Sequence, residues 1–332
     1  MEVISLFSGA GGLDLGFVKA GAEIIWANDI WADAAETYRK NIGNHIIVAD
    51  IRQLNTKSIP EAEVIIGGFP CLGFTIAKGK NRRPDDPYNF LYKEYLRLVN
   101  ELKPRAFLIE NVTGMAQGNA FKSLFESMIN GFKKVGYLVL FKILNAADYG
   151  VPQKRRRILI LGTRNDLNAT PRFPEITHSK YNTLEKTAPW ITLRDAIGDL
   201  PEDFDPLHDP EHVGSSHVVK INGYVGNRKL SWDEPSPTIT GRGSRTGGPV
   251  IHPHPSLQRR LSVKECKRLQ SFPDDFEFKG SISSMYAQIG NAVPPLLAFR
   301  VAQELIRSLG ESPKKYKPEE WELPWKNKIP PT

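Results

Sequence analysis

Short apolar runs alternate with amphipathic stretches from the first residue to about residue 165. The runs are rich in Ile, Val and aromatic residues, and they read EVISLF, AEIIWAN, HIIVAD, EVIIGG, RAFLIEN and RILILGTR. Buried parallel strands have continuous apolar sequences, and strands that alternate with helices form βαβ units. The pattern therefore predicts an α/β fold built on a doubly wound parallel sheet.

The pattern changes between about residues 170 and 282, where Pro, Gly, Ser and charged residues replace the apolar runs. Every histidine except His45 falls between residues 178 and 254. Segments of this composition form loops more often than regular elements. We therefore expect residues 1–169 to form the main domain and residues 170–282 to form a second, smaller and loop-rich domain.

A helical spacing returns near the C-terminus in SMYAQIGNAVPPLLAFRVAQELIRSL, from Val293 onward, with two prolines at its start. Proline is favoured in the first turn of a helix because the missing N–H would have no partner there. This pattern predicts that residues 283–312 pack back on the first domain and complete it. Residues 313–332 are rich in Pro and Lys, and we expect a surface tail anchored by Trp321 and Trp325.

Composition indicates a nucleic-acid partner and disfavours a membrane protein or a disulfide-stabilised fold. The 332 residues carry a net charge of +7 and a pI near 9.2, which favours a polyanionic partner. No apolar run approaches the roughly 18 residues of a membrane span, and no charged-then-apolar leader precedes the first run. Two cysteines cannot build a disulfide framework. These features predict a protein of the reducing cytoplasm with no membrane contact.

The stretch IIGGFPCLGFT places Cys71 where the fourth apolar run ends, with glycines and a proline interrupting regular structure on both sides. Open α/β sheets place ligands and reactive groups at the carboxyl ends of their strands. Cys71 is therefore a candidate nucleophile. The other cysteine, Cys266, is expected to be a small apolar residue of the core.

A glycine-rich turn, LFSGAGGLDLGF, follows the first apolar run, and its glycines allow the backbone to approach a ligand. A dinucleotide fingerprint needs a third glycine at the position of Asp14, where a carboxylate would repel a pyrophosphate. Asp29 and Asp50 end the second and third runs, where they suit ribose hydroxyls and an adenine amino group. Acidic strand ends without a phosphate cradle fit a cationic adenosine cofactor, S-adenosylmethionine (AdoMet). The alternative, that both aspartates are helix N-caps, is equally open.

Together the motifs resemble those of the cytosine-C5 DNA methyltransferase family. The resemblance is carried, in family order, by the turn Phe7–Gly12, GGFPC with Cys71, ENV at 110–112, QKRRR at 153–157, RRLSVKECKRLQSFPDDF at 259–276 and QIGNAVP at 288–294. One such motif alone would have little value, but the ordered set is specific and spans nearly the whole chain. The resemblance implies the Rossmann-like fold of AdoMet-dependent methyltransferases, with residues 170–282 as the target-recognition domain.

The family's chemistry assigns roles to several residues. Cytosine C5 is a poor nucleophile toward a sulfonium methyl group until another nucleophile adds at C6 of the ring. The resemblance implies that the Cys71 thiolate makes this addition, that Glu110 donates to ring N3 and that Arg157 contacts the base oxygen. It also implies that Arg155 supports the cysteine and phosphate region, and that the base flips out of the duplex. From the residues alone, Glu110 has a second interpretation, a buried ion pair with Arg155 or Arg157.

Cofactor and DNA contacts complete the expected site. By resemblance, the cofactor residues are Phe7, Gly9, Gly11, Gly12, Asp29, Asp50, Ile51 and Asn291. The basic loop AKGKNRRPDD, which includes Lys78 and Arg82, is expected to close over DNA. In the variable region we expect Thr238 to contact DNA and Arg242 or Arg245 to read a guanine, with a phosphate contact nearly as well supported.

Several positions depart from the family pattern, and among them Lys264 and Cys266 replace the commoner Arg and Ala, with a mild effect expected. Leu72 stands where a glutamine usually follows the cysteine, and Ile30 stands where many members have an aromatic residue against adenine. These departures bear on one loop contact to DNA and on cofactor affinity. His208, His212 and His217 lack the spacing of a metal site, and the family uses no metal.

We therefore expect an AdoMet-dependent DNA (cytosine-5-)-methyltransferase that acts on double-stranded DNA as a monomer. We place it in the cytoplasm at the nucleoid, paired with a restriction endonuclease. The nearest alternative is a tRNA cytosine-C5 methyltransferase, because one branch of the family acts on RNA. Further alternatives are an inactive DNA-binding relative, which the intact Cys71, Glu110 and Arg157 disfavour, and a nicotinamide oxidoreductase, which the missing third glycine disfavours.

Overall fold

The computed structural model describes residues 1–70, 90–116, 119–181, 187–204, 206–214, 218–222, 225–241, 251–256 and 258–330. The first five apolar runs form neighbouring parallel strands. These strands are β1 (Glu2–Leu6), β2 (Glu23–Asp29), β3 (Ile46–Val48), β4 (Val64–Gly67) and β5 (Ala106–Val112). The predicted α/β class is thereby confirmed.

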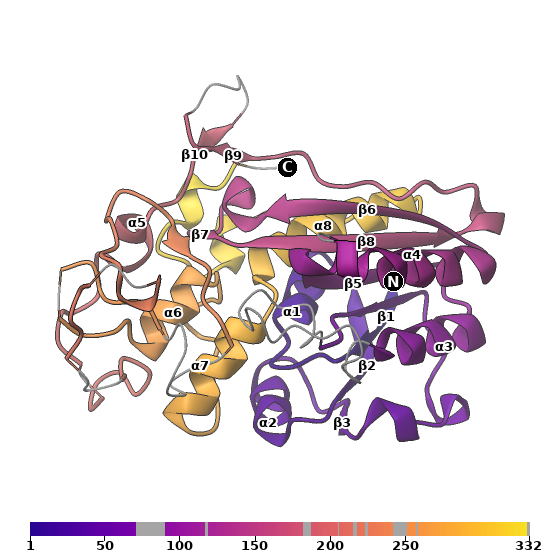
Figure 1. Cartoon of the computed structure of the whole chain (residues 1–332), viewed down its shortest axis with the longest axis horizontal. Coiled ribbons are helices and arrows are strands. Elements are labelled where there is room, and N and C mark those ends of the chain that lie inside the picture. Colours follow the sequence, from indigo (N-terminus) through magenta and orange to yellow (C-terminus); the bar gives the residue numbers. More distant parts are fainter. Residues whose placement is uncertain are drawn as a thin grey trace.

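Two further strands extend the sheet beyond β5. The strand β8 (Arg156–Arg164) lies antiparallel to both β5 and β6 (Tyr137–Asn145). Within the described residues the sheet therefore has the order β3-β2-β1-β4-β5-β8-β6 (Figure 1). The prediction of a wholly parallel sheet was wrong at β8, because a parallel crossover takes a dozen or more residues and residues 146–155 are too few.

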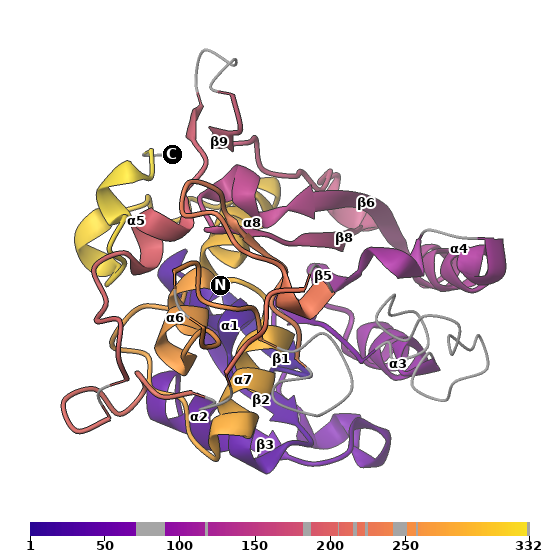
Figure 2. The same cartoon turned by 60° about the vertical axis from the view of Figure 1, so that its left-hand side comes forward.

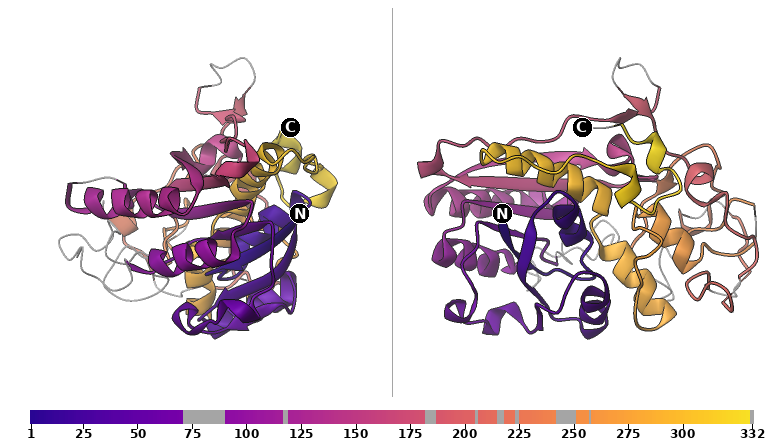
Figure 3. Two further views of the ribbon diagram at one scale, coloured as in Figure 1. Left: turned by 90° about the vertical axis from the view of Figure 1, so that its right-hand side faces the viewer. Right: turned by 180° about the vertical axis from the view of Figure 1, so that it is seen from behind.

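Helices cover both faces of this sheet. They are α1 (Gly12–Lys19), α2 (Ala32–Asn41) and α8 (Pro295–Ser308) on one face, and α3 (Tyr92–Leu102) and α4 (Asn119–Lys134) on the other. Successive strand residues alternate between the two apolar cores, so that Ile66 packs with α1 and α8 whereas Ile65 packs with α3 and α4. Figure 3 shows the yellow helix α8 lying across its face of the sheet.

The C-terminal helix expected from Val293 onward is present as α8, which begins at Pro295 with proline in its first turn. It packs closely on α1, because a Cβ added at Gly16 would lie 2.4 Å from Ala298 Cβ. Another helix, α7 (Ile282–Asn291), precedes it. The segment 283–312 thus packs on α1, the first helix of the sheet domain, through α8.

Residues 170–282 contain only short elements in their described part. These are β9 (His178–Ser179), β10 (Ala188–Pro189), α5 (Leu193–Ile197), β11 (Ser236–Pro237) and α6 (Val263–Leu269). Figures 1 and 2 show α5 and α6 to one side of the sheet, near α7. Their apolar side chains, which include the buried Cys266, join the same core as α1 and α8. The division into separate domains stays a prediction.

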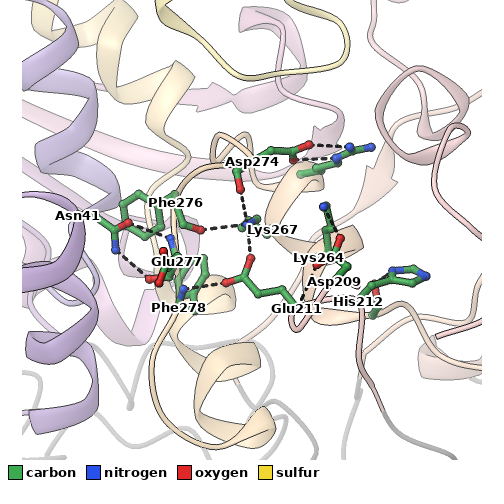
Figure 4. Close-up of polar contacts among 12 residues, drawn as sticks. Asn41, Asp209, Glu211, His212, Lys264, Lys267, Asp274, Phe276, Glu277 and Phe278 are labelled. Atoms are coloured by element: carbon green, nitrogen blue, oxygen red, sulfur yellow. Dashed lines mark hydrogen bonds and ion pairs between the residues drawn. The ribbon is translucent and has the colours of Figure 1, made fainter. Parts of the chain in front are cut away.

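A buried lysine holds separate parts of residues 170–282 together. Lys267 in α6 is 1% exposed, forms an ion pair with Glu211 and donates to the carbonyl oxygens of Asp274 and Phe276 at 3.1 and 3.0 Å (Figure 4). The same loop reaches α2, where Asn41 and the backbone of Glu277 exchange two hydrogen bonds of 2.8 Å. Lys267 therefore holds segments together that are far apart in sequence.

The C-terminal residues pack into the main core. Trp321 and Trp325 are each 1% exposed, and Trp325 Nε1 donates to Gly150 O at 3.1 Å. Lys314 N donates to Ala20 O at 2.9 Å, which joins the segment to the end of α1. Both tryptophans thus anchor this segment, as expected.

Among the described helices, none combines the length and the apolar composition that crossing a bilayer requires.

Candidate active site

The carboxyl ends of β1, β2, β4 and β5 meet at one edge of the sheet. Successive strands are added in opposite directions on either side of the β1–β4 pair, which makes this edge the switch point of the sheet. Open α/β sheets bind ligands in the crevice at such a point. Phe7, Asp29, Gly68 and Glu110 all stand at these strand ends, so the structure gathers there residues that the sequence assigned to one site.

Glu110 and Arg157 face each other across β5 and β8. Arg157 Nε lies 3.0 Å from Glu110 Oε1, and the Glu110 residue is 8% exposed. No well-aligned hydrogen bond reaches this oxygen from the described residues, so it retains capacity for a further donor. The expected ion-pair interpretation of Glu110 is therefore present in the structure, with Arg157 as the partner.

The backbone that leads into Cys71 is held beside Glu110. Asn111 Nδ2 donates to Phe69 O at 3.0 Å, and a Cβ added at Gly68 would lie 3.3 Å from Glu110 Oε2. The Phe69 ring also makes an edge contact with the Phe7 ring at 6.3 Å between centroids. Sequence reasoning gave Asn111 no role, although it belongs to the ENV motif. Cys71 itself lies outside the described residues, as do Lys78 and Arg82 of the basic loop.

Arg155 is buried, and its guanidinium is bonded to backbone carbonyl oxygens. Its Nη1 donates to Ile239 O at 3.0 Å and its Nη2 donates to Ala292 O at 2.9 Å. Burial lowers the pKa of Arg155 well below its usual value, the Arg157 charge lowers it further, and Glu110 opposes both effects. The sequence assigned Arg155 to support the cysteine and phosphate region, whereas its guanidinium in this structure holds the backbone of residues 239 and 292.

The segment around Thr238 lies along β7 (Gln153–Lys154), the short strand that precedes β8. The strand β11 pairs in parallel with β7, and Thr238 Oγ1 donates to Lys154 O at 2.8 Å. Gln153 Oε1 accepts from Ile239 N at 3.0 Å. The Thr238 side chain thus has a partner within the protein, and its DNA contact stays a prediction. Arg242 and Arg245 lie outside the described residues.

The glycine turn after β1 combines unusual backbone with open space. Phe7 has φ 53° and Gly9 has φ 55°, and left-handed backbone is uncommon for an aromatic residue. Apart from chain neighbours, no described atom lies within 4 Å of a Cβ built at Gly9. Gly11, at φ 88°, faces Tyr38 and Ile42, whereas Gly12 packs on Val293 O, 2.4 Å from an added Cβ. The open side of Gly9 suits a ligand, and Gly12 has a packing reason to be glycine.

The acidic strand ends are partly used within the protein. Asp29 accepts from Gly9 N at 2.7 Å and from Trp31 N at 2.8 Å, and burial raises the pKa of this carboxyl. Asp50 caps the short helix at Ile51 by accepting from Arg52 N, and the Arg52 side chain lowers the pKa of Asp50. The N-cap interpretation therefore holds for Asp50.

The remaining cofactor candidates differ in exposure. Ile51 is buried at 3% exposed, Ile30 is 67% exposed beside Asp29, and Asn291 is exposed against Gly241. An apolar side chain at a crevice rim, the open Gly9 and the Asp29 carboxylate fit an adenosine ligand with a positive charge. The residues present are thus compatible with AdoMet at the ends of β1 and β2.

Asp14 is a buried carboxyl beneath the glycine turn. Tyr38 OH donates to its Oδ1 at 2.9 Å, and burial raises the pKa of Asp14 to about 6. A carboxyl that holds its proton more tightly in the native state makes the protein less stable as pH rises from about 4 to 6, and the loss persists above that range.

Asp14→Asn is therefore expected to stabilise the protein at pH 7 to 8. A shift of this size corresponds to about 3 kcal/mol, and the gain should shrink as pH falls toward 5. Unfolding free energies from urea titrations over pH 5 to 8 measure this, with the exposed Asp275→Asn as control. A gain independent of pH would show that desolvation of the charge is not its cause.

No metal centre is evident in the part of the chain that the structure describes. There, no three His, Cys, Asp or Glu side chains are arranged to hold an ion. His212 is occupied by Pro201 O at 2.9 Å and by the Ser262 hydroxyl at 3.1 Å.

Comparisons with known proteins agree with this arrangement. A family model for C-5 cytosine-specific DNA methylases matches residues 1–307. The chain is 39% identical to the Type II methyltransferase M.MthTI of Methanothermobacter thermautotrophicus, over 93% of this chain and 98% of that protein. It is 38% identical to the Type II methyltransferase M.NgoFVII of Neisseria gonorrhoeae, over 92% and 86%. A crystal structure of a prophage protein of E. coli, assigned as a DNA modification methyltransferase, superimposes with a TM-score of 0.73 at 26% identity, covering 94% and 100%.

Proposed function

The chain belongs to the C-5 cytosine-specific DNA methylase family, and from that premise we propose which residues carry out its reaction. Membership makes it a DNA (cytosine-5-)-methyltransferase that takes its methyl group from AdoMet. The observation that carries the proposed mechanism is the pairing of Glu110 with Arg157 beside the backbone that leads into Cys71.

The Cys71 thiolate adds to C6 of a cytosine that has left the base stack, forming a carbon–sulfur bond. Electron density moves toward ring N3, where Glu110 in its protonated form donates its proton. Arg157 donates to the exocyclic oxygen and exchanges its contact with Glu110 for one with the base. These three residues together make C5 nucleophilic.

AdoMet, when bound, would supply the electrophilic methyl group and leave as S-adenosylhomocysteine. The Phe7–Gly12 turn, Asp29, Asp50, Ile51 and Asn291 would hold AdoMet. Ile30 provides an apolar rim instead of an aromatic face. After C5 has gained the methyl group, a base removes the C5 proton, the carbon–sulfur bond breaks, and Cys71 returns as thiolate. The proton given to N3 returns to Glu110, which completes the balance.

Double-stranded DNA is the proposed form of the substrate. The net charge of +7 suits a phosphate backbone, and the similar proteins are Type II methyltransferases, which gives the tRNA alternative no support. We place residues 170–282 over the DNA as a target-recognition domain, with the basic loop of Lys78 and Arg82 closing on it. We further propose a monomer that acts in the cytoplasm on the nucleoid and protects DNA from a partner endonuclease.

Expression in a bacterial host without cytosine methylation, followed by single-base sequencing of 5-methylcytosine in its genome, tests this proposal. A short motif methylated throughout is expected. A folded protein that binds AdoMet and leaves the DNA unmethylated would contradict it.

The same assay locates the guanine contact. Arg242→Ala or Arg245→Ala is expected to relax the motif at one guanine, because a bidentate arginine contributes about 1–3 kcal/mol of discrimination. Arg307→Ala, on the exposed side of α8, serves as a matched control that leaves the motif unchanged. An unchanged motif in both test variants would assign these arginines to phosphate contacts or to no DNA contact.

A further inference from the structure

Two buried glutamines join the Thr238–Gly241 segment to the rest of the site. Gln153 and Gln270 are both 0% exposed. Gln153 Oε1 accepts from Ile239 N at 3.0 Å, and Gln153 Nε2 donates to Gln270 Oε1 at 2.6 Å. Each amide thus has a defined orientation, because the other fixes which end donates.

Gln270 extends this set of hydrogen bonds to the C-terminal end of α7. Its Nε2 donates to Ile289 O at 2.6 Å and to Ala292 O at 3.0 Å. Arg155 closes the set by donating to Ile239 O and Ala292 O. We call this closed set of Gln153, Arg155 and Gln270 the polar clamp. The amide oxygen and nitrogen of both glutamines are bonded, and buried polar groups that are bonded at both ends hold a single geometry.

The last two residues of α7 and the two that follow, residues 290–293, form the turn that the polar clamp holds, and this turn is in close contact on two sides. A Cβ added at Gly290 would lie 2.2 Å from Thr240 C, and one added at Gly241 would lie 1.6 Å from Asn291 Oδ1. On the other side, Val293 O lies against Gly12 of the glycine turn. The 290–293 turn is therefore a spacer between the glycine turn and the segment that precedes Arg242.

One short stretch of chain carries two members of the clamp and the catalytic arginine, with Gln153 in β7, Arg155 between β7 and β8, and Arg157 in β8. Arg155 and Gln153 lie two and four residues before Arg157, so the clamp fixes the Thr238–Gly241 segment relative to the pocket as well. A shift of about 1 Å in such a segment is enough to misplace a reacting group and cost as much as 100-fold in rate.

We propose that Gln270 and Gln153 are positioning residues for DNA recognition, which act by holding the Thr238–Gly241 segment in register with Arg157 and the 290–293 turn. Neither residue contacts DNA, since both are fully buried. This inference rests on the proposed function. It adds that the fidelity of site choice depends on amides in the interior as well as on side chains at the DNA surface.

The test uses Gln270→Met, which keeps an unbranched side chain of similar length and removes the amide. We expect kcat/KM for DNA to fall roughly 10- to 100-fold, mainly through KM, with methylation appearing at sites related to the motif. AdoMet affinity without DNA should change little. Gln153→Met should give the same result, and the double variant should lose little more than either single variant, because both act through one clamp.

Gln303→Met is the matched control. Gln303 in α8 is 1% exposed and donates to Lys314 O at 2.8 Å, so its loss also removes a buried amide. It is expected to lower thermal stability without changing KM for DNA or site choice. If Gln270→Met fails to fold, Gln153→Met provides the same measurements.

Wild-type KM and site choice in the folded glutamine variants would overturn the inference, as would equal changes in Gln303→Met or additive losses in the double variant. Absence of methyl transfer to DNA by the wild-type protein would instead overturn the proposed function, and the inference with it.

Discussion

Cys71→Ser should bind DNA and AdoMet and transfer no methyl group. A serine hydroxyl is far less acidic than a thiol and adds poorly to the cytosine ring, so the first covalent step is lost while the shape of the site is kept. The described backbone places Gly68 beside Glu110 and bonds Phe69 O to the Asn111 amide, so the segment that leads into Cys71 is held at Glu110. The loss is expected to be complete in an assay of tritiated methyl transfer.

A chemical trap separates this loss from misfolding. With DNA made from 5-fluorodeoxycytidine triphosphate, the C5 fluorine cannot leave as a cation, so the adduct through sulfur should persist on a denaturing gel. The wild-type protein should form it and Cys71→Ser should not. Cys266→Ala, at the other cysteine of the chain, is the control and should form it. An adduct in Cys71→Ser, or sustained turnover, would assign the nucleophile to another residue.

Glu110→Gln is expected to lower kcat by about 10²- to 10⁴-fold, the range for loss of a positioned proton donor. The amide can still lie beside Arg157 and donate a hydrogen bond to ring N3, but it cannot transfer a proton there. Base binding should therefore survive better than turnover. Single-turnover rates at saturating DNA and AdoMet measure the chemical step directly.

The structural role of the Glu110–Arg157 ion pair needs its own control. Glu63 pairs with Arg105 at 2.7 Å at the opposite edge of the sheet, so Glu63→Gln removes a comparable ion pair away from the crevice. Both substitutions should lower the unfolding temperature, but only Glu110→Gln should slow methyl transfer. Equal rates in the wild type and Glu110→Gln would leave Glu110 as an ion-pair partner alone.

The strands were predictable where they are buried on both faces. The runs that became β1, β2, β4 and β5 are nearly continuous in apolar residues because helices cover both sides of them. The pattern missed β6, where Leu138, Leu140 and Phe141 are partly exposed at the edge of the sheet. It also could not show that β8 runs antiparallel, since direction depends on the length of the connection and not on the strand's own sequence.

The residues of the site were predictable where a reactive or charged side chain stands at a strand end. A cysteine, a glutamate and an acidic strand end each suggest a role from their position in the pattern. The polar clamp was not predictable in this way, because the structural role of Gln153 and Gln270 depends on hydrogen bonds to backbone atoms that are far away in sequence. The one hint in the sequence was that Gln153 lies in the QKRRR motif and Gln270 in the LQSFP part of the motif at 259–276.

Gly12 illustrates the same limit at a single position. Its place in the glycine turn favours a ligand contact, whereas the structure shows Val293 O occupying the space of a side chain. A glycine needed for close packing and one needed for a ligand look identical in a sequence.

The shared core has a consequence for synthesis on the ribosome. The sheet face beneath α1 is completed by α8 and by Trp321 and Trp325, which are made well after the strands they cover. A nascent chain therefore carries β1, β4 and β5 with that face uncovered until residues 295–325 have left the exit tunnel. We expect such chains to depend on chaperones during translation, and chains truncated before Pro295 to be degraded instead of accumulating as a smaller methyltransferase.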